Sequence, residues 1–200
     1  MSEIKTEGII LKTIPYQEKQ TIVTLFTLDQ GMVTLFVRQS KKSKHQSLIN
    51  PLSHIDVVYQ RIKTTELLSF KEGLMIENHY FLREKWSFLE AAGKMTSAIL
   101  FTQLPGKSAP QLYQLLLACL KQIPRFASSS VLITLFYLKL LTYEGVLSFE
   151  SEDMFPLPCT PLQWEMLKTM SETKVFSPYY LEKNLGSFCD QLEQLIKTVL

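Results

Sequence analysis

Residues 21–37 read TIVTLFTLDQGMVTLFV. Apolar and polar side chains alternate through Thr21–Thr27, and β-branched residues are frequent there, which is typical of a half-buried strand. A second apolar run, Met32–Val37, follows after Asp29-Gln30-Gly31. A three-residue loop of this kind holds a residue at positive φ, which glycine adopts without strain. The stretch therefore predicts a β-hairpin with Gly31 at the turn.

Three more short apolar segments lie on either side of this hairpin. They are led by Ile9-Ile10-Leu11, by Ile55, Val57, Val58, Tyr59 and Ile62, and by Leu67, Leu68 and Phe70. No helical pattern separates the five segments, and five short strands in succession favour a small antiparallel barrel. We therefore predict a barrel over residues 1–78.

The hydrophobic pattern takes a helical period after Asn78,. One predicted helical face consists of Leu82, Trp86, Leu89, Ala92, Met95 and Ile99. We expect Trp86 and the rest of this face to pack against other helices. Later helices are bounded by Gly145, which suits a C-terminal cap, and by Thr160-Pro161-Leu162-Gln163, which suits an N-terminal capping box,. The sequence thus predicts an α+β chain whose barrel is followed by an all-α domain over residues 79–200.

The composition is that of a globular chain of 200 residues, with 46% hydrophobic residues and a formal net charge of +2. Any nucleic-acid signal must therefore come from the local distribution of charge. The chain lacks phosphate-loop glycine motifs, an uncharged run long enough for a membrane span and an apolar signal segment,. Its distant cysteines, Cys119, Cys159 and Cys189, suit a reducing compartment,. We expect a cytoplasmic protein that does not act at a membrane.

Positive charge is concentrated between residues 36 and 63. The candidates for contact with a nucleic acid there are Arg38, Lys41, Lys42, Lys44, His45, Arg61 and Lys63. Such a basic stretch neutralises phosphates and releases their counterions. A solvated hairpin loop whose lysines keep a strand edge soluble explains the same residues. The charge pattern alone leaves both interpretations open.

Four aromatic residues lie near this basic stretch: Tyr16, Phe26, Phe36 and Tyr59. An exposed aromatic ring beside cations stacks an unpaired base. Most aromatic residues of strands belong to the core, so we expect Phe26 and Phe36 to be buried. The sequence does not decide between core and surface for Tyr16 and Tyr59.

No arrangement of residues points to catalysis. The histidines form no HExxH pair, and no serine lies in a GxSxG motif,. Glu150, Glu152 and Asp153 lie close together and leave a metal-dependent enzyme as one alternative, although a solvated acidic loop also explains them. The cysteines lack the paired spacing of a zinc site,. We expect no enzyme activity, no bound metal and no cofactor, with Cys119 and Cys189 as packing residues.

Several motifs in residues 6–73 form a pattern that is found in one family. A strand begins with GIILK at residues 8–12, and Tyr16 and Glu18 lead into a strand that ends in Phe-Thr. A glycine turn, a basic Ser-Lys loop and a Pro-Leu pair follow. This pattern resembles the RecO family of bacterial recombination mediators. The stretches APQLYQLLLACLKQI, residues 109–123, and LFYLKLLTYEGVL, residues 135–147, resemble helices of that family.

The resemblance implies an N-terminal OB-fold barrel and a C-terminal helical domain. It also implies binding of single- and double-stranded DNA, annealing of strands coated with single-strand-binding protein, and help to RecA together with RecR. The acidic tail of single-strand-binding protein has an apolar end, so its site needs an apolar groove with a cation. Lys121, Arg125 and Lys139 are the candidates for that cation.

The sequence departs from the family at one place. Many RecO proteins carry a four-cysteine zinc module after the position of Gly145, where this chain has LSFESEDMFPLPCTPLQ with Cys159 as its only cysteine. We therefore expect that the zinc module is lost. The alternative to a recombination mediator is an OB-fold module that binds proteins and no DNA.

Overall fold

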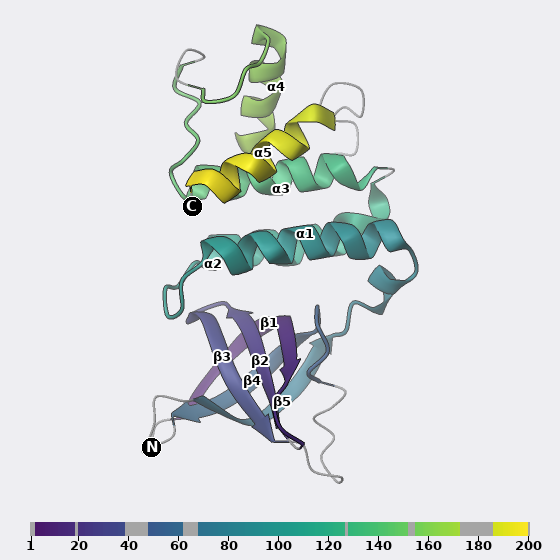
Figure 1. Cartoon of the computed structure of the whole chain (residues 1–200), viewed down its shortest axis with the longest axis vertical. Coiled ribbons are helices and arrows are strands. Elements are labelled where there is room, and N and C mark those ends of the chain that lie inside the picture. The colour runs from purple at the N-terminus through teal and green to yellow at the C-terminus, as the bar shows by residue number, and fades with distance from the viewer. Residues whose placement is uncertain are drawn as a thin grey trace. The chain divides into compact units, whose positions relative to one another are not determined.

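The chain divides into two compact units in the computed structural model (Figure 1). The structure describes residues 3–18, 20–38, 48–61, 68–126, 128–151, 155–172 and 186–199. One unit consists of residues 1–80 and 103–117, and the other of residues 81–102 and 118–200.

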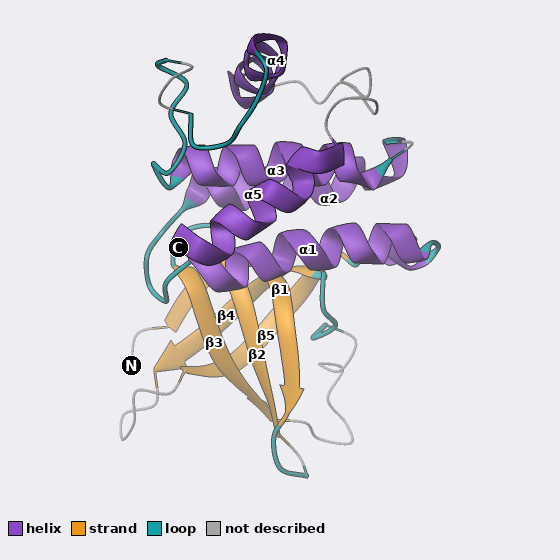
Figure 2. Ribbon diagram, turned by 45° about the horizontal axis from the view of Figure 1, so that its top comes forward, coloured by secondary structure: helices purple, strands orange, loops and turns teal. Residues whose placement is uncertain are grey.

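The first unit contains a closed five-stranded barrel, drawn in orange in Figure 2. Its strands are β1 (Glu3–Pro15), β2 (Gln20–Thr27), β3 (Gly31–Arg38), β4 (His54–Arg61) and β5 (Leu68–Glu77). They follow one another around the barrel in the order β1-β2-β3-β5-β4, and only β3 and β5 pair in parallel. This arrangement confirms the expected OB-fold barrel,.

The β2–β3 hairpin forms as predicted, with Gly31 at a φ of 64°. The Thr27 hydroxyl donates a hydrogen bond of 2.8 Å to the Gly31 carbonyl and closes the turn. A Cβ atom on Gly31 would lie 2.0 Å from the carbonyl oxygen of Lys107. Glycine is therefore required both by the turn and by the close approach of a second segment.

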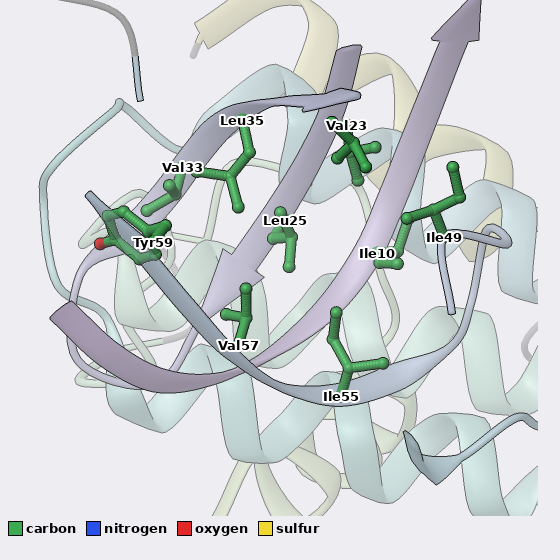
Figure 3. Close-up of a cluster of buried hydrophobic side chains, with 10 residues drawn as sticks. Ile10, Val23, Leu25, Val33, Leu35, Ile49, Ile55, Val57 and Tyr59 are labelled. Carbon is green, nitrogen blue, oxygen red and sulfur yellow. The ribbon is translucent and has the colours of Figure 1, made fainter. Parts of the chain in front are cut away.

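Strand alternation fills the barrel with aliphatic side chains (Figure 3). The core cluster consists of Ile10, Val23, Leu25, Val33, Leu35, Val37, Ile49, Ile55, Val57 and Tyr59. Tyr59 is only 2% exposed, which settles its place in the core. Phe26 is fully buried as expected, but it packs outside this cluster, with its ring 6.0 Å from that of Tyr113.

Residues 103–117 pack onto the barrel, although the sequence analysis places them in the helical domain. Pro105 bridges to Gly31 and Met32, and the Gly106 N–H donates to the Met32 carbonyl at 3.2 Å. Tyr113 is fully buried, and its hydroxyl lies 2.9 Å from Nε2 of His54. The domain boundary at residue 78 stays a prediction, and the last strand of the barrel ends at Glu77.

The second unit is helical around α3, as expected for the C-terminal part of the chain. The helical elements of the chain are η2 (Tyr80–Arg83), α1 (Trp86–Thr102), α2 (Pro110–Gln122), η3 (Ile123–Arg125), α3 (Ser129–Tyr143), α4 (Pro161–Glu172) and α5 (Gly186–Val199). Tyr80 and the part of α2 up to Leu117 belong to the first unit. Every residue from Val131 to Leu141 is buried, because α3 contacts α1, α4 and α5. A helix that is apolar on all sides has to be buried in this way.

The predicted helix ends are confirmed at two places. Gly145 has a φ of 74°, and the Val146 N–H donates to the Leu141 carbonyl at 2.9 Å, which ends α3,. Gln163 N–H donates to the Thr160 hydroxyl at 3.3 Å, and the Gln163 side chain accepts from the Thr160 N–H at 2.9 Å. This reciprocal pair is the capping box expected before α4.

The expectation for Trp86 is wrong, because its side chain is 79% exposed. The helical break after Arg83 interrupts the periodicity, so Leu82 and Trp86 do not share a helix face. Within α1 the buried side includes Phe88 and Met95. Trp86 lies two residues before Phe88 and nine residues before Met95. Both separations correspond to about half a turn, so Trp86 lies on the opposite, exposed side of α1,.

No described helix is both long and apolar enough to cross a membrane.

Candidate nucleic-acid interface

A row of partly exposed apolar side chains crosses the outside of β1, β2 and β3. Ile14 pairs with Ile22, and Ile22 pairs with Phe36, so the three side chains lie next to each other across the strands. Their neighbours Val23 and Leu35 are in the barrel core, which turns this row outward,. Ile14 is 42% exposed, and Ile22 and Phe36 are half-buried.

Tyr16 completes an aromatic pair at the end of this row. Its ring meets that of Phe36 edge-on, with 5.8 Å between centroids and 80° between planes. The Tyr16 N–H donates to the Gln20 carbonyl at 2.8 Å, which closes the turn between β1 and β2. Tyr16 is 44% exposed, so it is available at the surface. Phe36 was expected in the core and instead lies half-buried on the outer face, because alternation places Leu35 and Val37 inside.

Cations flank the apolar row on both sides. Arg38 is exposed two residues after Phe36 and pairs with Gln20, so both lie on the outward side. Lys12 is exposed and pairs with Thr24. It therefore lies on the side of the apolar row opposite to Arg38. We call Lys12, Ile14, Tyr16, Ile22, Phe36 and Arg38 the aromatic face.

Arg61, at the end of β4, is the other described residue among the candidates for contact with a nucleic acid. Arg61 is exposed and pairs with Leu68, which pairs in turn with Leu35 of β3. Strand β5 therefore separates Arg61 from β3, and the pairing sets Arg61 level with Leu35 of the core, so the structure does not place Arg61 on the aromatic face. The other candidates, Lys41, Lys42, Lys44, His45 and Lys63, lie outside the described residues.

Sequence reasoning missed Lys12 as a member of this face. Ile9, Ile10 and Leu11 precede it as an unbroken apolar run, so strict alternation does not assign Lys12 to either side. The register between β1 and β2 shifts between Ile10 and Lys12, and this bulge resets the side-chain direction,. The alternation of Lys12, Ile14 and Tyr16 after the bulge is the signal that would have found them.

The outer surface of β1 and β4 is acidic on another side of the barrel. Glu7 pairs with Asp56, and Oε2 of Glu7 lies 3.4 Å from Nε2 of the buried His54. Burial raises the pKa of Tyr113, and the carboxylates of Glu7, Asp56 and Asp29 raise it further. Tyr113 is therefore a neutral hydrogen-bond partner of His54 at physiological pH.

Of the three residues predicted to bind a partner, Lys139 is not available, because the structure buries it. It is only 8% exposed, and its Nζ donates a hydrogen bond of 2.8 Å to the carbonyl of Ser171 in the last turn of α4. Burial lowers the pKa of Lys139. The lysine lies within the apolar stretch of α3, so its ammonium group satisfies a helix end and is not free for a partner,.

Arg125 lies at the edge of a pocket of about 690 Å³ within the helical unit. The lining combines Lys85, Phe88, Arg125 and Phe126 with the serines at the start of α3, Ser128–Ser130, and it also includes the acidic Glu90 and Asp190. Lys94 also lines it and pairs with Glu90 and Glu193 at 3.8 and 3.9 Å. Lys121 is exposed on α2 and does not line this pocket.

A second pocket, of about 550 Å³, lies between α1, α3 and α5. Its walls include Gly93, Ala98, Phe101, Tyr137 and Ile196. Its lining is more apolar than that of the pocket beside Arg125.

Among the described residues, no group of three histidine, cysteine or acidic side chains is placed to hold a metal ion. Glu150 is exposed, and Glu152 and Asp153 lie outside the described residues. Cys119 and Cys189 are buried, as expected for packing residues, and burial raises the pKa of both thiols. The loss of the zinc module stays a prediction.

Comparison with known proteins supports the resemblance expected from the sequence. Residues 1–79 match the family model described as "Recombination protein O N terminal". The chain is 29% identical over 147 residues to the DNA repair protein RecO of Chlamydia pneumoniae, and this match covers 72% of the chain. It is 29% identical over 145 residues to RecO of Bacillus pumilus, also over 72% of the chain.

The matched part spans less than two thirds of these relatives, 58% and 56% of their length. A longer match, at 24% identity over 200 residues, joins 99% of the chain to 80% of the DNA repair protein RecO of Chlamydia trachomatis. The similarity thus begins with the barrel and continues into the helices. The first 79 residues thus match the N-terminal family model of recombination protein O, and the chain as a whole is similar to proteins named DNA repair protein RecO.

Proposed function

We propose that this chain is a RecO-like recombination mediator of gap repair that binds DNA without covalent chemistry. The observation that supports this best is the aromatic face, where the exposed Tyr16 and the half-buried Phe36 lie between cations on the outside of an OB-fold barrel. The relatives are named as DNA repair proteins, which agrees with the proposal. A cytoplasmic location, with neither an enzyme activity nor a cofactor, belongs to the same proposal.

Binding would use two kinds of contact. Tyr16 and Phe36 would stack an unpaired base, while Arg38 and Lys12 would meet phosphates on either side,. Stacking requires unpaired bases, so single-stranded DNA would use the whole face and double-stranded DNA mainly its cations. Neutralised phosphates repel each other less, which would speed the annealing of complementary strands.

The partners of this activity would be single-strand-binding protein and RecR, with RecA as the indirect beneficiary. The pocket beside Arg125 suits the acidic tail of single-strand-binding protein, because Lys85 and Arg125 would attract carboxylates and Phe88 and Phe126 would hold an apolar end. Arg125→Ala should weaken binding of a synthetic peptide of that tail by at least fivefold. Phe101→Ala, in the second pocket, is the matched control and should bind normally.

The DNA site is tested by replacing its exposed aromatic residue. Tyr16→Ala should weaken binding to a labelled oligothymidine by roughly five- to a hundredfold, because stacking on an aromatic side chain contributes about 1–3 kcal/mol per base. The measurement is fluorescence anisotropy with the full chain. Tyr143→Ala removes a tyrosine of similar exposure, 47%, from the end of α3 and should leave the affinity unchanged.

The rival function is an OB-fold module that binds proteins alone. It predicts no oligothymidine binding by the unsubstituted chain, or binding that Tyr16→Ala leaves unaltered. Either result, in chains whose thermal unfolding is normal, would remove DNA from the proposal. The most direct functional measurement is annealing of complementary strands coated with single-strand-binding protein, with and without this chain.

A further inference from the structure

The outside of β5 exposes two large aliphatic side chains. Leu74 is 70% exposed and Ile76 is 47% exposed. Leu74 is the most exposed large hydrophobic residue among the described residues of the barrel unit. Water is an unfavourable environment for both side chains, at roughly 25 cal/mol per Å² of apolar surface, so a partner that covers them gains free energy.

These side chains belong to a strand with an open edge. Strand β4 pairs with β5 along its whole length, from Leu68 to Glu77. On the other side, β3 pairs only with Leu68 and Ser69. Within the described residues, no strand pairs with this edge of β5 beyond Ser69. Edges of this kind accept an added strand, and natural proteins usually blunt them with lysine or proline.

The regular part of the open edge is Glu72–Met75. The register with β4 shifts on both sides of it, between Val58 and Tyr59 and between His54 and Ile55. Between these bulges the pairing is continuous, from Val58 with Glu72 to Ile55 with Met75. An extended segment can therefore pair with a short, undistorted ladder that has Leu74 in its middle.

The surroundings of Leu74 are acidic. Leu74 pairs with Asp56, and Asp56 pairs with Glu7 of β1, so two carboxylates lie in one row with it. Glu72 is exposed two residues earlier on the same strand. Two exposed lysines border these acidic groups, since Lys5 pairs with Val58, the partner of Glu72, and Lys71 precedes Glu72. We call Glu7, Asp56, Glu72, Leu74 and Ile76 the acidic face. Its charge favours a partner that carries lysine or arginine.

From this combination we propose that β5 is a docking edge for an extended basic segment of a partner protein. The segment would add a strand along Glu72–Met75, place apolar side chains against Leu74 and Ile76, and place lysine or arginine beside Asp56 and Glu72. Backbone hydrogen bonds would supply much of the affinity, and the alternation of apolar and basic residues would supply the specificity.

Selection from a random-peptide phage library tests the edge, with the full chain immobilised. We expect enriched peptides in which apolar residues alternate with lysine or arginine. Leu74→Lys should weaken the binding of the best peptide at least tenfold, because it buries a charge and adds repulsion. Leu162→Lys is the matched control, since Leu162 is 67% exposed on α4, and it should bind normally.

Backbone pairing is tested with a peptide that is N-methylated at alternate positions, which should lose binding altogether. The proposal is overturned if no peptide sensitive to Leu74→Lys is enriched, if the enriched peptides are acidic, or if the N-methylated peptide binds as well. Sedimentation velocity tests whether a second copy of the chain occupies the edge. A dimer of the unsubstituted chain that Leu74→Lys abolishes would assign the edge to that second copy and overturn the proposal. Thermal unfolding of Leu74→Lys should match that of the unsubstituted chain.

Discussion

The aromatic face and the acidic face belong to one barrel and are built by the same strand alternation, yet they expose opposite charges. On β1–β3 the outward positions hold Tyr16 and Phe36 between Lys12 and Arg38. On β4 and β5 they hold Asp56, Glu72 and Leu74. The same mainly aliphatic core lies beneath both faces, so the residues on the outward positions can differ without a change in the core. One small fold therefore presents a basic surface with aromatic residues and a mainly acidic surface.

The largest effect is expected when the aromatic face is given the charge of the acidic face. Lys12→Glu with Arg38→Glu should lower the affinity for an oligothymidine by more than tenfold. Loss of two phosphate contacts should also reduce the log–log slope of affinity against salt by about 1.4. Titrations of anisotropy at several salt concentrations measure both quantities.

The control for this double variant is Lys121→Glu with Lys168→Glu, which makes the same change of net charge outside the barrel. An equal loss of affinity in both double variants would show that total charge, and not this face, governs binding. Lys41→Ala with Lys42→Ala tests the neighbouring basic loop in the same assay and should also reduce the slope by about 1.4. An unchanged slope in that variant would confine the phosphate contacts to the strands.

A smaller effect is expected on the acidic side, where the polar groups serve the fold. Tyr113→Phe removes a hydroxyl that lies 2.9 Å from Nε2 of the buried His54. Loss of this hydrogen bond should lower the free energy of unfolding by about 1–2 kcal/mol. Urea unfolding measures the change, and Tyr143→Phe at an exposed position should leave stability unaltered. DNA binding should be normal in both, and a weaker affinity in Tyr113→Phe would contradict the separation of the two faces.

Much of the barrel could be predicted from the sequence, but not which outward positions form a site. Alternation and the glycine turn fix the hairpin of Thr21–Val37 locally. Phe36 could not be assigned to the outside, because a strand pattern gives two faces and not the choice between them. Lys139 was predicted to bind a partner because a lysine side chain is normally solvated. In the structure α3 is surrounded by α1, α4 and α5, which bury this lysine. The contact of residues 103–117 with Gly31 joins segments that are far apart in the sequence, so no local sequence pattern predicts it.

Alkaline pH should destabilise the barrel and the helical unit together. Burial raises the pKa values of Tyr59, Tyr113, Tyr137, Cys119 and Cys189. The unfolded chain releases these protons near the ordinary values, about 8.5 for cysteine and about 10 for tyrosine, while the folded chain keeps them. Stability that is fully present below about pH 8 should therefore fall as the pH rises, by up to about 1.4 kcal/mol per pH unit for each group.

Lys139 acts in the opposite direction, because its lowered pKa makes the folded state gain stability as the pH rises toward the ordinary lysine value,. It is one group against five, so the net change should still be a loss. Thermal unfolding from pH 7 to pH 11 measures it, with tyrosinate absorbance as a second observable. The chain has eight tyrosines, some of them exposed, so only absorbance that reaches its full value before unfolding would show that the buried tyrosines titrate in the folded state.

The smallest expected effect concerns the border between the two faces. Lys71 is exposed on β5, one residue before Glu72 of the acidic face. Lys71 is the extra residue of a bulge in β5, because Tyr59 pairs with Phe70 and Val58 with Glu72, and the pairing of β5 with β3 ends two residues before it, at Ser69. If Lys71 contacts a phosphate, Lys71→Ala should reduce the salt slope by about 0.7 and leave sequence preference unaltered, because phosphate contacts do not distinguish bases. Lys107→Ala, at another exposed lysine of the same unit, is the control and should change neither. An unaltered slope in Lys71→Ala would end the DNA surface at β3 and assign the whole of β5 to the acidic face.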